Sequence, residues 1–211
     1  MDQRLVIGTY DLDEDLIARV RTTREPAQRV AAVASRMVVL GRGSKPEMEL
    51  RVDNCLADGV PVLRRGGGCA VFLDEGNIVV SVVLPVTGIA GNDRYFCDIT
   101  KWLTAGLSEI GVPGVRPAGV SDLALGDRKV GGACIHRSKD VLYYSTTLLI
   151  SPDVDAMERY LAQPPKEPDY RRGRAHREFV GRLSLPRSME NTEGLAEALR
   201  AALKFPIAFG S

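Results

Sequence analysis

The feature that most constrains this chain is a loop within residues 62–77, where two arginines run into three consecutive glycines and then into an apolar strand. The glycines at 66–68 lack a Cβ, so the backbone can turn sharply there and approach a ligand closely. Successive N–H groups in such a turn form a concave anion site, and the guanidinium groups of Arg64 and Arg65 suit phosphate or carboxylate. The stretch therefore predicts an anion-binding loop.

The elements around this glycine loop distinguish it from a P-loop. A P-loop continues through Gly-Lys-Ser/Thr into a helix, whereas Val71, Phe72 and the run 78–84 predict buried strands. A glycine-rich hairpin that carries two surface arginines is the structural alternative, because glycine turns are common. The loop alone leaves both interpretations open.

Charge and cysteine content exclude several classes of function. The chain of 211 residues has a net charge of +1, so it offers no overall electrostatic attraction to nucleic acid or to an anionic membrane. Its four cysteines show no C-x-x-C spacing, which predicts reduced thiols and neither a zinc site nor a disulfide framework. We expect a cytoplasmic protein with no nucleic-acid partner, no membrane partner and no bound metal.

Periodic patterns predict helices and strands that alternate along the chain. Helices are predicted over 11–21, 46–58, 92–110, 154–161 and 193–203, and strands over 4–9, 36–41, 60–63 and 78–84. Residues 115–150 have the pattern of an antiparallel meander, and residues 163–174, rich in proline and charge, are predicted as a solvated loop. Because the strands come in hairpin-like groups, we expect an α+β domain with a mixed, largely antiparallel sheet flanked by helices.

A second group of informative residues lies at 120–134. Lys129 follows a turn and stands directly before Gly131 and Gly132, where the missing side chains leave room beside the backbone. An ammonium held next to such a space can bind a phosphate and a carbonyl oxygen together. Asp122 lies one hairpin earlier and is expected at the same end of the sheet. A solvated lysine at a strand end is the structural alternative.

These motifs, in this order, resemble the lipoate–protein ligase A family, within the superfamily of biotin ligases, lipoate ligases and octanoyltransferases. The resemblance covers about residues 36–185. It rests on Arg-x-x-Gly-Gly-x-Ala-Val-Phe-x-Asp-x-Gly-Asn at 64–77, Ser-Asp-Leu at 121–123, Asp-Arg-Lys-Val-x-Gly at 127–132 and Thr-Leu-Leu at 147–149. The tract 161–183 also looks like the segment that follows the core in this family.

The resemblance implies the biotin/lipoate ligase catalytic-domain fold and a two-step reaction. Lipoate or octanoate would react with ATP, accompanied by Mg²⁺, to give an acyl-adenylate and pyrophosphate. The acyl group would then pass to a lysine of a lipoyl carrier domain, such as an E2 domain or a glycine-cleavage H-like protein. Lys129 would be catalytic, holding the acyl carbonyl and the α-phosphate, and Arg64 would bind phosphate. The other implied substrate- and nucleotide-binding residues are Gly66, Gly67, Gly68, Cys69, Ala70, Val71, Phe72, Asn77, Asp122, Gly132 and Ala133.

Five positions depart from the family pattern when the chain is aligned on Ala70-Val71. Leu63 stands in place of the first arginine, Cys69 of the third glycine, Leu73 of a histidine, and Ser145-Thr146 of a histidine-glycine pair. The resemblance therefore leaves the acyl substrate open. We expect residues 1–211 to form one catalytic domain without an accessory C-terminal domain, so that a separate accessory subunit would assist adenylation.

Three other functions are compatible with parts of this pattern. An octanoyltransferase takes its acyl group from a carrier-bound thioester and uses a cysteine well downstream of the lysine, whereas Cys134 is the last cysteine here. A biotin ligase is disfavoured because its Gly-Arg-Gly-Arg loop is absent from the equivalent position. A non-catalytic protein that binds lipoate or an acyl-adenylate is a third possibility, which the retained Arg64 and Lys129 disfavour.

Overall fold

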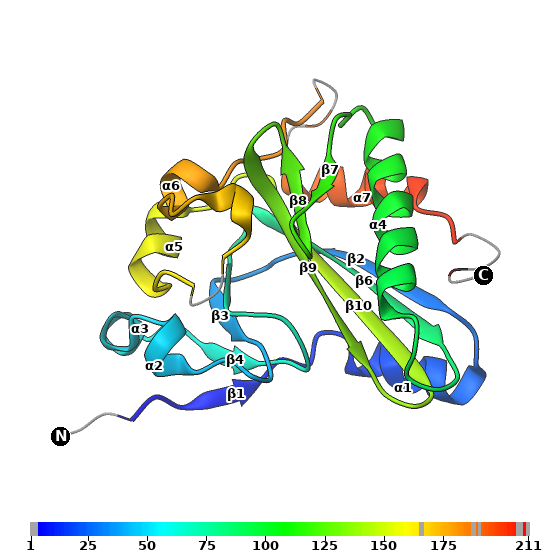
Figure 1. The fold of residues 1–211 in the computed structure, drawn as a ribbon, viewed down its shortest axis with the longest axis horizontal. Helices are drawn as coiled ribbons and strands as arrows, with labels where there is room; N and C mark the ends of the chain where they lie inside the picture. The colour runs from blue at the N-terminus through cyan, green and yellow to red at the C-terminus, as the bar shows by residue number, and fades with distance from the viewer. Residues whose placement is uncertain (1–3, 165–166, 187–188, 190, 206–208, 210–211) are drawn as a thin grey trace.

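The protein is an α+β structure built around two sheets, as Figure 1 shows for the computed structural model. The structure describes residues 4–164, 167–186, 189, 191–205 and 209. The larger sheet is antiparallel throughout and has the strand order β2 (Ala27–Ala32), β6 (Asn77–Pro85), β10 (Val141–Leu149), β9 (Arg128–Arg137), β8 (Asp122–Leu125) and β7 (Arg116–Ala118). The smaller sheet is mixed, in the order β1 (Ile7–Thr9), β4 (Val62–Arg64), β3 (Met37–Leu40) and β5 (Val71–Leu73). The expected fold class is confirmed, with the strands divided between two sheets.

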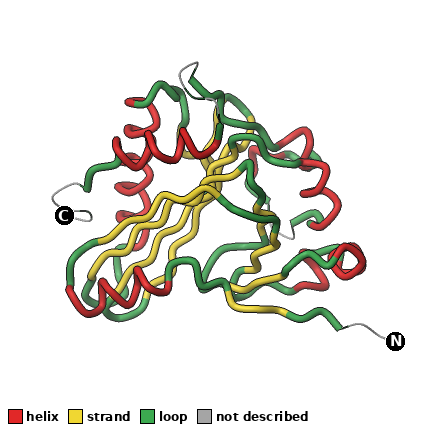
Figure 2. The backbone as a smooth tube through the Cα atoms, turned by 180° about the vertical axis from the view of Figure 1, so that it is seen from behind, coloured by secondary structure: helices red, strands yellow, loops and turns green. Residues whose placement is uncertain are grey.

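Helices flank both sheets. They are α1 (Glu14–Thr23), α2 (Pro46–Glu49), α3 (Val52–Asp58), α4 (Asn92–Glu109), α5 (Val154–Tyr160), α6 (His176–Phe179) and α7 (Thr192–Ala202), with a 3₁₀ turn at Asp169–Arg171. Figure 2 shows the long strands of the larger sheet side by side. In Figure 1, α4 and α7 lie on one side of these strands, and the small sheet, α5 and α6 lie on the other. In the described part of the chain, no helix has the length and apolar character needed to cross a bilayer.

The larger sheet and its two long helices form the main apolar core. Ile99, Leu103 and Leu107 are fully buried along one face of α4, as the helical spacing predicted. Leu103, Leu107 and two leucines of α7, Leu195 and Leu199, belong to one cluster with residues of β6 and β10. These side chains therefore hold α4 and α7 against the larger sheet.

The smaller sheet has its own core, which reaches the end of the larger sheet. Phe72 of β5 packs on Tyr160 of α5 with ring centroids 5.4 Å apart, and Phe179 of α6 lies in the same cluster. Leu149, at the end of β10, also belongs to this cluster. The two sheets thus meet at the end of β10, and the space between them is the place for a site.

Several local predictions needed correction. The helix predicted over 46–58 is two helices, because the backbone at Leu50 pairs with Leu161 and the N–H of Arg51 donates to the carbonyl of Tyr160 at 2.8 Å. Strand β2 was missed because its buried residues, Ala27 and Val30, are three apart instead of alternating. The α6 turn was missed as well.

The glycine-rich hairpin, the alternative interpretation of residues 62–77, is not formed. Strand β4 pairs with β3 in parallel and β5 pairs with β3 antiparallel, so the strands before and after the glycines lie on opposite sides of β3. The glycine loop therefore crosses the end of β3 instead of turning back on itself.

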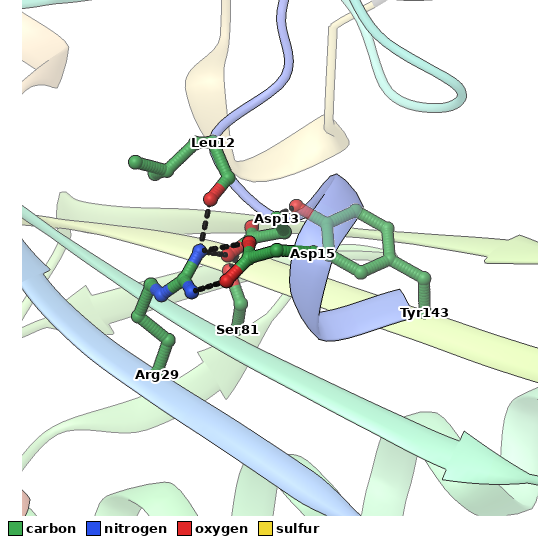
Figure 3. A network of polar contacts seen from close by, with 6 residues as sticks. All are labelled: Leu12, Asp13, Asp15, Arg29, Ser81 and Tyr143. Carbon is green, nitrogen blue, oxygen red and sulfur yellow. Dashed lines mark hydrogen bonds and ion pairs between the residues drawn. The ribbon is translucent and has the colours of Figure 1, made fainter. Parts of the chain in front are cut away.

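A buried carboxylate joins α1 to the larger sheet (Figure 3). Asp13 precedes α1, and its Oδ2 accepts hydrogen bonds from the hydroxyls of Ser81 at 2.5 Å and Tyr143 at 2.7 Å. Its Oδ1 lies 3.2 Å from Nη1 of Arg29, which also pairs with the exposed Asp15. Burial first, and then the charge of Asp13, raise the pKa of Tyr143, so its hydroxyl keeps the proton that it donates.

We expect Asp13→Ala to lower the free energy of unfolding by about 3 kcal/mol, because it leaves two hydroxyls and a partly buried guanidinium without their shared acceptor. Urea denaturation measures this loss. Asp15→Ala is the matched control, since it removes an exposed partner of the same arginine and should move the midpoint much less. Equal shifts for the two variants would contradict the assignment of Asp13 as the anchor.

Candidate functional site

A cavity of about 470 Å³ lies between the two sheets. Strand β5 and the end of the glycine loop form one wall, and β8, β9 and β10 form the facing wall. A third wall comes from the chain that follows β10. Of the predicted site residues, those that line the cavity are Gly68, Cys69, Ala70, Val71, Phe72, Asp122, Lys129, Gly132 and Ala133.

Lys129 and Asp122 form an ion pair inside this cavity. Nζ of Lys129 lies 2.7 Å from Oδ1 of Asp122. The Asp122 side chain is 8% exposed, whereas that of Lys129 is 31% exposed. A Cβ on Gly132 would lie 3.1 Å from both Cε and Nζ of Lys129. The prediction that Asp122 lies at the same end of the sheet as Lys129 is confirmed, and the missing side chain of Gly132 makes room for the lysine itself.

Tyr170 reaches the same carboxylate from the third wall. Its hydroxyl donates to Oδ2 of Asp122 at 2.9 Å. Burial first, and then the Asp122 charge, raise the pKa of this tyrosine. The two oxygens of Asp122 are therefore taken by two different residues.

The glycine loop is fixed by close backbone contacts. A Cβ on Gly41, just after β3, would lie 1.6 Å from the carbonyl oxygen of Gly68, so only glycine permits this approach. Gly68 has φ +82°, in the left-handed region. A Cβ on Gly66 would lie 2.9 Å from the ring of His136, and one on Gly67 would lie 3.0 Å from the carbonyl oxygen of Ile135. Gly66 and Gly67 thus pack against β9 and shape the loop without lining the cavity.

The two arginines of the loop have different surroundings. Nη1 of Arg64 donates to the carbonyls of Gly41 at 2.7 Å and Ser44 at 3.1 Å, and Arg64 is not among the lining residues. Arg65 is 9% exposed and lines the cavity, and its Nε has no hydrogen-bond partner among the described residues. A guanidinium at a cavity wall is suited to an anion. The structure thus brings Arg65, instead of Arg64, to the cavity.

Glu49 of α2 lines the cavity and connects three chain segments around it. Its Oε2 accepts from the backbone N–H of Ala70 and from the hydroxyl of Ser44, both at 2.9 Å. Its backbone carbonyl accepts from the N–H of Ala162 at 2.9 Å. One residue therefore ties the glycine loop to the loop after β3 and to the chain after α5. Nothing in the sequence distinguished this glutamate from a surface charge on a helix.

Part of the third wall, residues 163–174, was predicted as a solvated loop, and that prediction is wrong for Arg171. Arg171 is 4% exposed, lines the cavity, and has its guanidinium 4.9 Å above the ring of Phe179. His176 also lines the cavity, and burial, then the charge of Arg171, lower its pKa to about 4, so the imidazole is neutral at pH 7. Pro165 and Lys166 of this tract lie outside the described residues. The resemblance of residues 161–183 to the segment after the family's core was the better guide to this wall than the proline- and charge-rich composition of 163–174.

Asn77 has a structural position outside the cavity. Its side chain is fully buried, and Nδ2 donates to Oδ1 of Asp74 at 2.6 Å. Oδ2 of Asp74 accepts from the N–H of Asp153 at 2.7 Å, which ties the turn before β6 to the start of α5. The role of Asn77 in substrate binding remains a prediction from the resemblance.

The cysteines have contrasting exposure. Cys69 is exposed and lines the main cavity. Cys134 is buried on β9 and lines a second hollow, which adjoins the main cavity at Gly68 and Ala133 and reaches Phe96 of α4. Burial raises the pKa of the Cys134 thiol, which disfavours the thiolate. Among the described residues, no group of three His, Cys, Asp or Glu side chains is arranged to hold a metal ion.

Comparison with known proteins gives consistent results. A Mycoplasma genitalium protein described as a probable lipoate-protein ligase A is 34% identical over 125 residues, which cover 59% of this chain and 37% of that protein. The lipoate-protein ligase A of Psychrobacter cryohalolentis is 31% identical over 134 residues, which cover 62% of this chain and 37% of that protein. The chain thus spans well under half the length of these curated relatives.

Solved structures share the fold. A lipoate-protein ligase A crystallised with ATP superimposes with a TM-score of 0.75 at 22% identity, covering 96% of this chain and 84% of that one. A chain from a Thermoplasma acidophilum structure, described as a bipartite lipoate protein ligase and its E2 lipoyl domain, gives a TM-score of 0.72 at 21% identity, covering 90% of this chain and 74% of that one.

The family assignment follows from a family model that spans most of the chain. The model for the lipoyl protein ligase A/B catalytic domain matches residues 9–203, which include the glycine loop, the Lys129 strand and the third wall. The chain therefore belongs to the lipoyl protein ligase A/B catalytic domain family.

Proposed function

We propose that this protein is an ATP-dependent lipoate–protein ligase, which activates lipoate or octanoate as the acyl-adenylate and transfers the acyl group to a lysine of a lipoyl carrier domain. The observation that carries the proposal is the Lys129 ammonium, which lies 2.7 Å from Asp122 at the wall of the cavity, where the missing side chain of Gly132 makes room for the lysine. A fixed cation at that place serves both steps, because each step builds negative charge on an oxygen.

In the first step, the acyl carboxylate attacks the α-phosphorus of ATP and pyrophosphate leaves. Charge accumulates on the phosphoryl oxygens in the transition state, and a preorganised ammonium stabilises it. Arg65 supports this step, because it brings a second positive charge to the cavity wall. Mg²⁺ would enter with ATP, with phosphate oxygens and water as its main ligands.

In the second step, the carrier lysine attacks the acyl carbonyl and AMP leaves. The carbonyl oxygen becomes an oxyanion, which the same ammonium can hold. The mixed anhydride is already activated, so no side-chain nucleophile is required. The buried Cys134 with its raised pKa fits this route and disfavours the octanoyltransferase alternative, which needs a thiolate.

The comparisons support the substrates and partners in the proposal. The neighbour crystallised with ATP supports ATP as the nucleotide. The Thermoplasma acidophilum neighbour, a bipartite ligase with its E2 lipoyl domain, supports a lipoyl carrier domain as acceptor and a separate accessory subunit as helper. We propose that residues 1–211 act as one catalytic domain in such a two-part system.

The direct test is a two-part assay of the purified chain. Incubation with ATP, Mg²⁺ and lipoate should give lipoyl-AMP by mass spectrometry, with an accessory subunit added in a parallel sample. Preformed lipoyl-AMP with an apo lipoyl domain should give the lipoylated domain. Binding of lipoyl-AMP without transfer would favour the non-catalytic carrier, and absence of binding would exclude both functions.

We expect Lys129→Ala to slow adenylate formation and transfer from preformed lipoyl-AMP alike, by roughly 10²–10³, the usual effect of losing one preorganised donor. Lys129→Arg should not restore the rate, because a planar fork does not replace a compact point charge. Single-turnover kinetics measure both steps, and thermal unfolding checks the fold. Normal transfer from preformed adenylate by Lys129→Ala would remove this residue from the second step.

We expect substitution of Arg65 and of Arg64 to affect the binding of lipoyl-AMP differently. Arg65→Met should weaken binding of lipoyl-AMP by about 10-fold or more, since a charge-assisted hydrogen bond to the phosphate is lost. Arg64→Met should instead loosen the loop after β3 and weaken binding less, because its Nη1 already serves two carbonyls. Calorimetry with lipoyl-AMP decides between them. A larger loss for Arg64→Met would restore the phosphate-binding role that the resemblance implies for Arg64.

Cys134→Ser should leave the rate of acyl transfer within about 2-fold of the wild-type rate, because the adenylate route uses no thiol. The measurement is transfer from lipoyl-AMP to the carrier, with octanoyl-thioester offered as the alternative donor. Loss of transfer, or use of the thioester in place of ATP and free acid, would establish an octanoyltransferase instead.

A further inference from the structure

Tyr170 belongs to the chain segment that forms the third wall, between the lining residues Pro168 and Arg171, but does not itself line the cavity. No step of the proposed mechanism uses it. Its hydroxyl donates to Oδ2 of Asp122 at 2.9 Å, while Nζ of Lys129 lies 2.7 Å from Oδ1 of the same carboxylate. Asp122 is 8% exposed. A buried carboxylate thus joins the third wall to the cation that faces the cavity.

Tyr170 is itself held from several directions. Its ring packs on Phe179 with centroids 5.0 Å apart. Its backbone carbonyl accepts from Nη2 of Arg174 at 2.9 Å, and Nη1 of Arg174 pairs with Asp127 at 3.0 Å, in the turn between β8 and β9. The hydroxyl is therefore presented to Asp122 from a fixed position.

The chemistry of the pair explains why a third group matters. A lysine ammonium sits on a flexible four-carbon stem and has three donors, so one ion pair does not by itself fix its direction. A carboxylate held by one oxygen can still rotate about its last torsion, which is broad. A donor on the second oxygen removes that freedom, and two N–H groups of Lys129 stay available for a substrate.

We propose that Tyr170 is a positioning residue for Lys129 and acts through Asp122. The inference rests on the proposed function for its kinetic consequence, since it concerns the cation of that site. The third wall would then help to position the Lys129 ammonium as well as enclose the cavity, because Asp122 contacts both Tyr170 and Lys129.

The test is Tyr170→Phe, which removes the hydroxyl and keeps the ring that packs on Phe179. We expect turnover in both half-reactions to fall about 10-fold, the scale of one lost hydrogen bond to a charged group, with the KM for ATP within about 2-fold of wild type. Tyr160→Phe is the matched control, because it also removes a hydroxyl bonded to a carboxylate, at 2.8 Å from Asp58, outside the cavity lining. It should leave turnover unchanged.

A double-mutant cycle tests whether the effect passes through Asp122. In an Asp122→Asn background, Tyr170→Phe should change turnover by less than about 2-fold, because the shared partner is already altered. If the double variant lost turnover by the product of the two single-variant factors, the two residues would act independently and the proposal would be overturned. A fall in the thermal midpoint of Tyr170→Phe well beyond that of Tyr160→Phe, with normal turnover per folded molecule, would also overturn it.

A second measurement does not depend on ligase activity. Acetic anhydride labels accessible lysine amines, so acetylation of Lys129, followed by mass spectrometry, reports how firmly the ion pair with Asp122 keeps its Nζ in place. We expect several-fold faster labelling in both Tyr170→Phe and Asp122→Asn and no change in Tyr160→Phe. Faster labelling in Asp122→Asn alone would refute the role of Tyr170, whereas failure of the wild type to form lipoyl-AMP would refute only the proposed function.

Discussion

The contact between Gly41 and Gly68 is the constraint on which the rest of the site depends. A side chain on Gly41 would collide with the carbonyl oxygen of Gly68, so the end of β3 and the glycine loop can meet only where side chains are absent. That contact lets the loop cross the end of β3 and return as β5 on the other side of that strand. It also places Arg65 against the cavity instead of in solvent.

Buried charge is distributed unevenly in this molecule, and the pattern separates stability from function. Asp13 and Asp74 have their oxygens taken by groups that join secondary structures, and neither lines the cavity. Around the cavity, by contrast, Arg65 keeps an unused donor, and Lys129 is held by only one carboxylate oxygen. Unspent hydrogen-bonding capacity in a buried site costs stability unless a ligand uses it. The two cations at the cavity wall support the anionic substrate of the proposed function.

The sequence predicted the elements whose periodicity is unambiguous. Helix α4 was predicted within one residue because Ile99, Leu103 and Leu107 repeat at helical spacing. The meander of β7 to β10, which carries Asp122 and Lys129, followed from short apolar segments separated by turns. Its failures have two causes. The break at Leu50 depends on pairing with Leu161, more than a hundred residues along the chain, which no local pattern records. The burial of Arg171 depends on the ring of Phe179 in an irregular segment without a periodic pattern.

The sequence by itself determined which residues are chemically able to act, because glycines, arginines and a lysine in that order are the groups that bind anions and stabilise oxyanions. It also predicted that Asp122 lies at the same end of the sheet as Lys129, since one hairpin separates them, and the structure adds the direct contact. Only the tertiary structure decided which arginine faces the cavity, and that Tyr170 and Glu49 hold its walls. The physical reason is that adjacent residues in an irregular loop follow no fixed period, so the direction of each side chain is set by what packs against it. Arg64 donates hydrogen bonds to backbone carbonyls after β3, whereas Arg65 lines the cavity between the sheets.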